Sequence, residues 1–244
     1  MSTCRILGIP VEVGDKNLLF EKCAALVGIG GVICTPNPLI LSNSVENKAL
    51  RRALLSADLL IPDGSGFLPF LRRADARAAV LPGVELGQRL VRLRPGLSLG
   101  LVGAEEGIAA HAFSALAKGA NELRSAFLLN GYETRLSALL SALRSEKPEL
   151  CFVCLGSPRK EILMQSLRAY SEKTLFLGLG GSLDVYAGAV RRAPTLLRNL
   201  HLEWLYRMCI EPRRLRTLPA LMRFPYLCAR YREENNNFTK NGSS

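Results

Sequence analysis

The feature that most constrains the fold is an alternation of short apolar runs with longer segments that carry apolar residues three or four positions apart. The short runs predict strands over residues 4–7, 32–35, 59–61, 97–102, 126–129, 150–155 and 174–179. The longer segments predict helices over residues 39–56, 85–93, 108–118, 135–144 and 158–170. Because parallel strands need crossover connections, this pattern predicts an α/β fold with a Rossmann-like, mostly parallel sheet and helices on both faces.

The alternation stops at about residue 190, and the composition changes there. Residues 191–232 hold ten arginines and two acidic residues, a net charge of +8 out of +11 for the whole chain. We expect this segment to be divided into short helical pieces by Pro194, Pro212, Pro219 and Pro225. The chain is thus predicted to have an α/β core over residues 1–190, a basic amphipathic appendage over 191–234 and a disordered tail over 235–244.

The side chains of the appendage suit a surface that meets phosphate and lipid together. A planar, permanently charged guanidinium binds phosphate or pyrophosphate better than an ammonium group does. Apolar and aromatic residues lie among the arginines, at Trp204, Tyr206, Met208, Leu218, Met222 and Phe224. This mixture favours docking on an anionic membrane surface over a solvated basic face, at roughly 1 kcal/mol per basic residue near the lipid. Binding of substrate pyrophosphate by the same arginines is compatible with docking.

Composition and charge argue against several other classes of protein. No apolar run reaches the ~18–20 residues that span a bilayer, and the first residues lack the pattern of a signal peptide. The seven cysteines lie mostly in apolar runs, which is typical of a reducing compartment. The basic charge is confined to one segment without a nucleic-acid-binding motif, so we expect no nucleic-acid partner. The expected location is cytoplasmic, with peripheral attachment to the inner face of the cell membrane.

Six loops follow the carboxyl ends of the predicted strands, where ligands bind in sheets of this kind. They are TPNP at 35–38, PDGSG at 62–66, VGAEEG at 102–107, NGYE at 130–133, GSPRKE at 156–161 and GGSLD at 180–184. Each loop is rich in turn-forming residues in any case, so a single one is weak evidence for a site. Gly180 and Gly181 suit a phosphate cradle and a tight turn equally well.

Taken together, the loops carry several spaced motifs in one order. They are Thr35-x-Asn37, Pro62-Asp63-Gly64-x-Gly66, Pro82-Gly83-x-Glu85-Leu86, Leu155-Gly156-Ser157-Pro158-Arg159-Lys160-Glu161, Gly178-x-Gly180-Gly181-x-x-Asp184-x-x-Ala187-Gly188, Arg192-Ala193-Pro194, Leu202-Glu203-Trp204-Leu205-Tyr206-Arg207 and Glu211-Pro212-x-Arg214. In these motifs the chain resembles the WecG/TagA/CpsF family of bacterial glycosyltransferases, which add N-acetylmannosamine or a related sugar to a lipid-linked acceptor.

The resemblance implies an inverting, metal-independent transfer of a hexosamine from a UDP-sugar to an undecaprenyl-pyrophosphate-linked sugar, in the synthesis of cell-envelope polysaccharide or teichoic acid. Asp63 is then the catalytic base, and Thr35 and Asn37 line the same pocket. Substrate-binding groups are expected at Lys160, Glu161, Gly180, Gly181, Asp184, Arg192, Arg207 and Arg214, and groups for membrane or pyrophosphate at Arg213, Arg216 and Arg223. The UDP-sugar and the lipid-pyrophosphoryl acceptor are the expected partners, with no cofactor and no metal, and a homo-oligomer is compatible with this role.

The chemistry of the residues agrees with such a reaction. Inverting transfer needs one base to take the proton of the acceptor hydroxyl, and Asp63 precedes glycines that allow a substrate to approach closely. An ordinary Pro-Asp-Gly turn is the alternative interpretation of the same residues. No two aspartates have the Asp-x-Asp spacing of a metal-held donor site. The pyrophosphate charge is therefore expected to be met by backbone N–H groups, helix N-termini and arginines.

Three positions depart from the family pattern: Lys160 stands where glutamine is usual, Val80 where an arginine is common and Thr217 where the last arginine is expected. We hypothesise that Lys160 contacts a substrate phosphate. The departures keep open a catalytically impaired homologue that binds UDP and acts as a membrane scaffold, and a basic nucleic-acid-binding protein is a weaker alternative. A dehydrogenase is disfavoured, because Leu183 occupies the place of the third glycine in the dinucleotide fingerprint.

Overall fold

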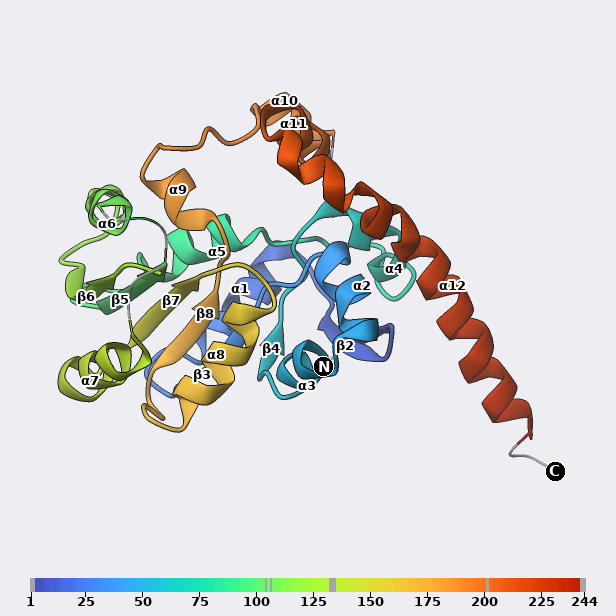
Figure 1. The fold of residues 1–244 in the computed structure, drawn as a ribbon, viewed down its shortest axis with the longest axis horizontal. Coiled ribbons are helices and arrows are strands. Elements are labelled where there is room, and N and C mark those ends of the chain that lie inside the picture. The colour runs from blue at the N-terminus through green and yellow to red at the C-terminus, as the bar shows by residue number, and fades with distance from the viewer. Residues whose placement is uncertain (1–2, 104, 106, 132–134, 201, 242–244) are drawn as a thin grey trace.

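The computed structural model shows a six-stranded, fully parallel sheet with the strand order β4-β3-β8-β7-β5-β6 (Figure 1). Its strands are β3 (Gly31–Cys34), β4 (Leu59–Leu60), β5 (Ser98–Gly103), β6 (Arg124–Leu129), β7 (Leu150–Cys154) and β8 (Leu175–Gly178). The structure describes residues 3–241 except 104, 106, 132–134 and 201, and within them all side chains except those of 198–199, 207, 212–214 and 232–241. The expected α/β fold with a parallel sheet is confirmed.

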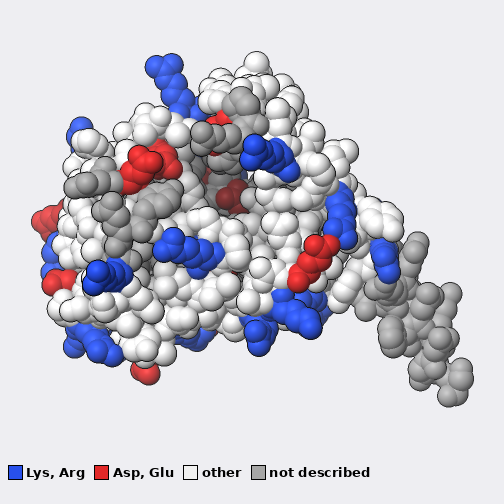
Figure 2. All heavy atoms as spheres, in the orientation of Figure 1, with Lys and Arg blue, Asp and Glu red and all other residues white. Residues whose placement is uncertain are grey.

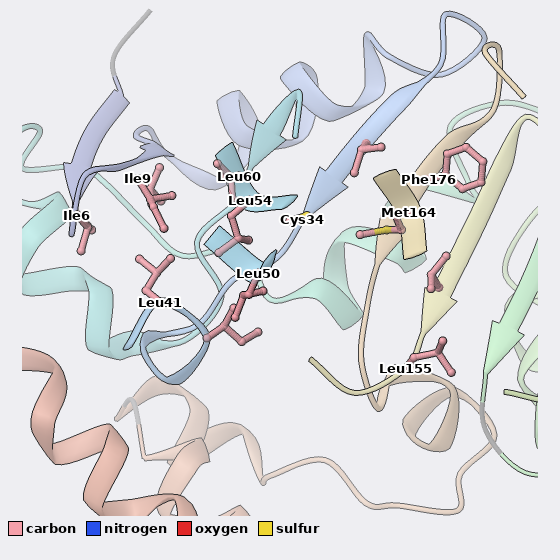
Figure 3. Packing of buried hydrophobic residues seen from close by; sticks show 14 of the residues in the cluster. Ile6, Ile9, Cys34, Leu41, Leu50, Leu54, Leu60, Leu155, Met164 and Phe176 are labelled. Carbon is pink, nitrogen blue, oxygen red and sulfur yellow. The ribbon is translucent and has the colours of Figure 1, made fainter. Parts of the chain in front are cut away.

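Helices cover both faces of the sheet, and each face has its own apolar cluster. One cluster joins the sheet to α2 (Pro38–Glu46), α3 (Lys48–Leu55), α7 (Leu136–Glu146) and α8 (Arg159–Arg168), and Figure 3 shows side chains that meet there from strands and helices. The other joins it to α1 (Lys16–Ala24), α5 (Gly83–Leu90), α6 (Ile108–Ala117) and α9 (Ser182–Tyr186). The central strands are apolar on both sides because both of their faces are buried.

The first predicted strand lies outside this sheet. Residues 4–7 overlap β1 (Thr3–Ile6), which pairs antiparallel with β2 (Ile9–Glu12) in a hairpin of its own. The two turn residues, Leu7 and Gly8, have φ angles of 52° and 75°. Two successive residues with positive φ match the twist of a tight hairpin. Leucine is unusual in such a turn, so the pattern of residues does not predict it.

The single helix expected over residues 39–56 is two helices, α2 and α3, which meet at Asn47. Asn47 leaves the helical conformation, and its side chain accepts a hydrogen bond of 2.9 Å from the backbone N–H of Leu50. The asparagine therefore caps the start of α3 instead of continuing α2. In the same way Asp15 caps α1, a helix that the periodicity does not predict.

The appendage consists of α10 (Thr195–Asn199), α11 (Glu203–Ile210), the 3-10 helix η2 (Pro212–Thr217) and the long helix α12 (Leu218–Asn241) (Figure 1). Pro219 lies in the first turn of α12, where its missing N–H costs nothing. A boundary does fall beside Pro219, since η2 ends at Thr217 and α12 begins at Leu218, but Pro225 lies inside α12, so the expected division at Pro225 is wrong. The helix also continues through residues 235–241, which the composition predicts to be disordered. A helix that is already nucleated gains one hydrogen bond for each residue added, even in a polar segment.

The first half of α12 packs into the core. Phe224 is 2% exposed. Its ring makes edge-to-face contacts with Phe67 and Phe70 of the short helices η1 (Ser65–Phe67) and α4 (Leu68–Leu71), at centroid distances of 5.7 and 5.4 Å. Arg223 donates to Glu46 at the end of α2 over 2.6 Å. Each such ring pair adds about 0.5–1.5 kcal/mol to the burial of apolar surface. The apolar core therefore extends past residue 190 into the appendage.

We predict that Phe224→Ala lowers the free energy of unfolding by about 3–5 kcal/mol, because it opens a cavity beside Phe67 and Phe70. Met222→Ala, on the same helix but at a side chain that is 68% exposed, is the matched control. It should change the free energy by less than about 0.5 kcal/mol. Urea unfolding of the full-length chain, followed by circular dichroism, measures both. Equal effects of the two substitutions would contradict the packing of α12 on the core.

Candidate active site

The loops that follow β3 and β4 run side by side beyond the carboxyl edge of the sheet. The backbone N–H of Ile61 donates to the Cys34 carbonyl and that of Asp63 to the Pro36 carbonyl, both over 2.9 Å. These bonds continue the pairing of the two strands past their ends and bring the TPNP and PDGSG segments together. Figure 2, in the orientation of Figure 1, shows a hollow below the connection between α9 and α10, and atoms of Asp or Glu residues lie at its bottom.

Asp63 and Thr35 meet at Gly83, the first residue of α5. The backbone N–H of Gly83 donates to Oδ2 of Asp63 over 3.1 Å. The Thr35 hydroxyl donates to the carbonyl of Gly178 over 2.6 Å. A β-carbon on Gly83 would lie 3.1 Å from Oγ1 of Thr35 and 3.5 Å from Oδ2 of Asp63. The two side chains therefore flank a helix N-terminus, whose partial positive charge favours a carboxylate.

Asn37 lies beside the same loops and caps a helix. Its side chain accepts a hydrogen bond of 2.9 Å from the backbone N–H of Ile40, at the start of α2. Gly64 has a φ of 100°, a conformation that favours glycine. A β-carbon on Gly64 would lie 3.7 Å from Cβ of Asn37. The structure thus brings together the three residues that the family resemblance places in the catalytic pocket.

Lys160 and Glu161 lie on the α8 side of β8, whereas Thr35 and Asp63 face α5. The side chains of Lys160 and Glu161 are 4% and 1% exposed, and Nζ of Lys160 lies 2.5 Å from Oε1 of Glu161. Burial raises the pKa of the nearby Cys34 thiol to about 12, and Glu161 adds to this shift while Lys160 opposes it. The ammonium group of Lys160 is thus paired with Glu161, and its contact with a phosphate stays a prediction.

Gly180 and Gly181, which are expected to cradle a phosphate, lead directly into α9, a helix of five residues. A β-carbon on Gly181 would lie 3.5 Å from Oδ2 of Asp184, so this carboxyl faces back toward Gly181. Burial raises the pKa of Asp184 above its ordinary value, a backbone N–H opposes the shift, and Glu105 and Glu211 add to it. An anion held at Gly180 and Gly181 would have acidic neighbours and would need positive charge from another part of the chain.

Tyr186, which no sequence pattern singles out, is the last residue of α9 and links this helix to α5. Its hydroxyl donates to the carbonyl of Val84, in the first turn of α5, over 2.8 Å. The side chain is buried, and burial raises the pKa of the hydroxyl well above its ordinary value. The phenol is therefore a permanent donor near neutral pH. The sequence offers no signal for this role, because the partner lies on a helix about a hundred residues earlier.

The arginines expected to bind substrate belong to the appendage. Nε of Arg192 lies 3.6 Å from Oε1 of Glu203, at the start of α11. Arg216 is exposed, and Arg223 is half-exposed in its ion pair with α2. The backbones of three further expected residues lie in α11 and η2, but their side chains lie outside the described residues: Arg207, Arg213 and Arg214. Parts of the loops at 102–107 and 130–133 also lie outside them.

The described side chains and helices also bear on metal binding and on membrane insertion. No three His, Cys, Asp or Glu side chains among them gather in a group that would hold a metal ion. No described helix combines the length and the apolar composition needed to cross a bilayer. All seven cysteines are free thiols, and Cys151 and Cys154 are buried as expected of packing residues.

Comparison with known proteins places the chain in a family. The model of the glycosyl transferase WecG/TagA/CpsF family matches residues 4–237. The N-acetylglucosaminyldiphosphoundecaprenol N-acetyl-beta-D-mannosaminyltransferase of Bacillus subtilis (strain 168) is 28% identical over 232 residues, which cover 94% of this chain and 88% of that protein. The family match includes the core, the loops of the site and all of residues 191–234.

We predict that Lys160→Gln lowers the free energy of unfolding by about 3 kcal/mol or more, because it leaves the buried Glu161 carboxylate without its cation. The double variant Lys160→Gln/Glu161→Gln removes both charges and should recover most of the loss. Chemical denaturation at pH 7 measures both variants against the unmodified chain. If the single and the double variant prove equally stable, the buried pair does not form.

Proposed function

Because the chain belongs to the WecG/TagA/CpsF family of glycosyl transferases, we propose that it transfers N-acetylmannosamine, or a closely related hexosamine, from a UDP-sugar to a lipid-linked pyrophosphoryl sugar. Membership confirms the resemblance that the spaced motifs predict, and it makes the chain a glycosyltransferase. The name of the Bacillus subtilis relative gives its acceptor as N-acetylglucosaminyldiphosphoundecaprenol and its sugar linkage as β. We carry both to this chain as part of the proposal.

The observation that carries the proposal is the meeting of Asp63 and Thr35 at Gly83. An α-linked sugar nucleotide gives a β product when a single displacement inverts the anomeric carbon, and such a step needs one general base. In the proposed step the Asp63 carboxylate takes the proton of the acceptor hydroxyl as its oxygen bonds to the anomeric carbon. The bond from that carbon to the donor phosphate oxygen breaks, and UDP leaves with the electron pair.

The other groups of the site orient the reactants in this mechanism. The Gly83 N–H, 3.1 Å from Oδ2, keeps the Asp63 carboxylate in one orientation. The Thr35 hydroxyl donates its proton to the Gly178 carbonyl. Its oxygen lone pairs therefore stay available, and in the proposed mechanism they accept a hydrogen bond from a sugar hydroxyl. We assign the pyrophosphate of the donor to the backbone N–H groups of Gly180 and Gly181 and to the arginines at 192, 207 and 214. Lys160, Glu161 and Asp184 stay expected substrate-binding groups, because a carboxylate repels a phosphate and Lys160 is paired with Glu161.

A lipid-linked acceptor also gives a reason for the surface of the appendage. Large apolar side chains are exposed along α10, α11, η2 and α12, namely Leu196, Leu200, Trp204, Leu205, Ile210, Leu215, Met222 and Tyr226. Arg216 and Arg223 lie among them, and a basic side chain near anionic lipid contributes about 1 kcal/mol. We propose that this surface docks on the inner face of the cell membrane, while Phe224 holds α12 to the core.

We predict that Asp63→Asn lowers kcat for transfer by at least about 10²-fold, because an amide does not take the acceptor proton. The assay offers the full-length chain a panel of UDP-sugars and a short-chain lipid-pyrophosphoryl-N-acetylglucosamine in EDTA. Asp75→Asn is the matched control, since Asp75 is also a turn aspartate, which accepts the Arg77 backbone N–H, and this variant should keep the full rate.

The outcomes of this assay separate the alternatives. Transfer by Asp63→Asn at the full rate would reduce Asp63 to a turn residue and contradict the mechanism. UDP binding without transfer by the unmodified chain would favour the impaired scaffold. Transfer that needs added divalent metal would contradict the metal-independent step.

We predict that Met222→Ser combined with Tyr226→Ser weakens binding to anionic phospholipid vesicles by at least about tenfold, because burying a large apolar side chain contributes about 1.5–3 kcal/mol. Ile29→Ser is the control, since Ile29 is 68% exposed like Met222 but lies in a loop of the core. Sedimentation with vesicles measures all three proteins. Equal loss in the control would place the docking surface elsewhere.

A further inference from the structure

We propose that Tyr186 is a positioning residue for the catalytic base: its hydroxyl fixes the first turn of α5, and that turn presents the Gly83 N–H to Asp63. The inference rests on the proposed role of Asp63. It concerns a contact between α9 and α5 that joins two motifs nearly a hundred residues apart in the chain.

The start of α5 has no capping side chain of its own. Pro82 precedes the helix and makes no side-chain cap hydrogen bond. Asp63 fills that place from a different loop, because its Oδ2 accepts the N–H of Gly83 over 3.1 Å. The orientation of the carboxylate therefore depends on where the first turn of α5 lies. A general base works at about 2.6–3.2 Å from the oxygen whose proton it takes, so a small shift of this turn is enough to misalign it.

The contacts on the outer side of α5 are exposed ion pairs and stacking. Lys16 pairs with Glu85 at 2.8 Å, and the two side chains are 47% and 30% exposed. The Arg89 guanidinium lies 4.0 Å from the centre of the Phe20 ring. Exposed pairs of this kind contribute little to holding a backbone in one place, because solvent screens them.

The contact on the inner side is buried and short. The Tyr186 hydroxyl donates to the Val84 carbonyl over 2.8 Å, and the residue is 7% exposed. A β-carbon on Gly87, one turn further along α5, would lie 2.5 Å from this hydroxyl. The missing side chain of Gly87 lets the phenol reach the helix backbone. Beside the Leu81 N–H, which donates to the Pro62 carbonyl over 3.0 Å, Tyr186 is thus a buried side-chain contact that locates the turn from which Gly83 meets Asp63.

The phenol keeps its proton in this environment. Burial raises the pKa of Tyr186 well above its ordinary value, Cys154 and Asp63 add to the shift, and Arg192 opposes it. Tyr186 therefore acts as a constant donor, and the expected effect of removing its hydroxyl is geometric.

The test is Tyr186→Phe in the full-length chain, which keeps the ring and removes the donor. We expect kcat for transfer to fall roughly three- to tenfold, as the loss of one hydrogen bond allows, while KM for the UDP-sugar stays within about twofold. Nitrogen-15 NMR of the same variant should show the Gly83 amide proton moved upfield and exchanging faster with solvent, because its bond to Asp63 is weakened. Tyr170→Phe is the matched control, at a tyrosine that is 45% exposed and stacks with Arg144 beyond the end of α8.

The two measurements separate this inference from the proposed function. An unchanged Gly83 resonance in Tyr186→Phe overturns the inference, whether or not the chain transfers sugar. A shifted resonance with an unchanged kcat overturns it as well, because the turn then moves without consequence for the base. Absence of transfer by the unmodified chain is a failure of the proposed function, and it is seen before any variant is compared. A fall in kcat together with a shift of Gly83, with neither change in Tyr170→Phe, supports the positioning role.

Discussion

The site depends on the close approach of three chain segments at Gly83. A β-carbon there would lie within 3.5 Å of atoms from Thr35, Asp63 and Leu179, which follow β3, β4 and β8. These three strands are neighbours in the order β4-β3-β8, so the order of the sheet brings together residues that are far apart in the chain. Parallel strands end at the same edge, and their loops converge there. A larger residue at Gly83 would push this convergence apart.

The long helix of the appendage reaches the same loops from the outside. Phe224 packs on Phe67, four residues after Asp63, and Arg223 is paired with α2, the helix that Asn37 caps. The elements that carry two of the expected catalytic residues therefore lie under α12. Membrane docking, as proposed, would act on a helix that is itself part of the apolar core. A chain cut after about residue 192 would lose buried side chains together with those proposed to face lipid.

Much of the core is predictable from the sequence because its strands are buried on both sides. The runs at 32–35, 150–155 and 174–179 have no polar interruption, and they become β3, β7 and β8 with small changes at their ends. The edge strand β6 begins two residues earlier than the run at 126–129, because the exposed Arg124 and Ser125 still pair with β5. Pairing at an edge does not require apolar side chains, so hydrophobicity alone does not mark its start.

The site is less predictable, because its contacts are not periodic. The residue types of the PDGSG loop suit either a turn or a base, and for Asp63 the resemblance to a family favours the base, which stays a prediction. The hairpin turn at Leu7 and Gly8 and the cap at Asn47 depend on single backbone conformations. The Tyr186 hydroxyl donates to the carbonyl of Val84, about a hundred positions earlier, and no local sequence pattern indicates such a contact. The burial of the Lys160 and Glu161 pair likewise follows from tertiary packing.

The distribution of charge between core and appendage suits a sugar nucleotide under the proposed function. At the carboxyl edge of the sheet Asp63 and Asp184 are acidic, and Lys160 is neutralised by Glu161 at 2.5 Å. A pyrophosphate brought to this edge would face negative charge in surroundings that are partly desolvated, which is unfavourable unless cations accompany it. The ten arginines of residues 191–232 hold most of the net positive charge of the chain. A core that repels the leaving group and an appendage that attracts it together favour transfer where the appendage is docked, next to the lipid-linked acceptor.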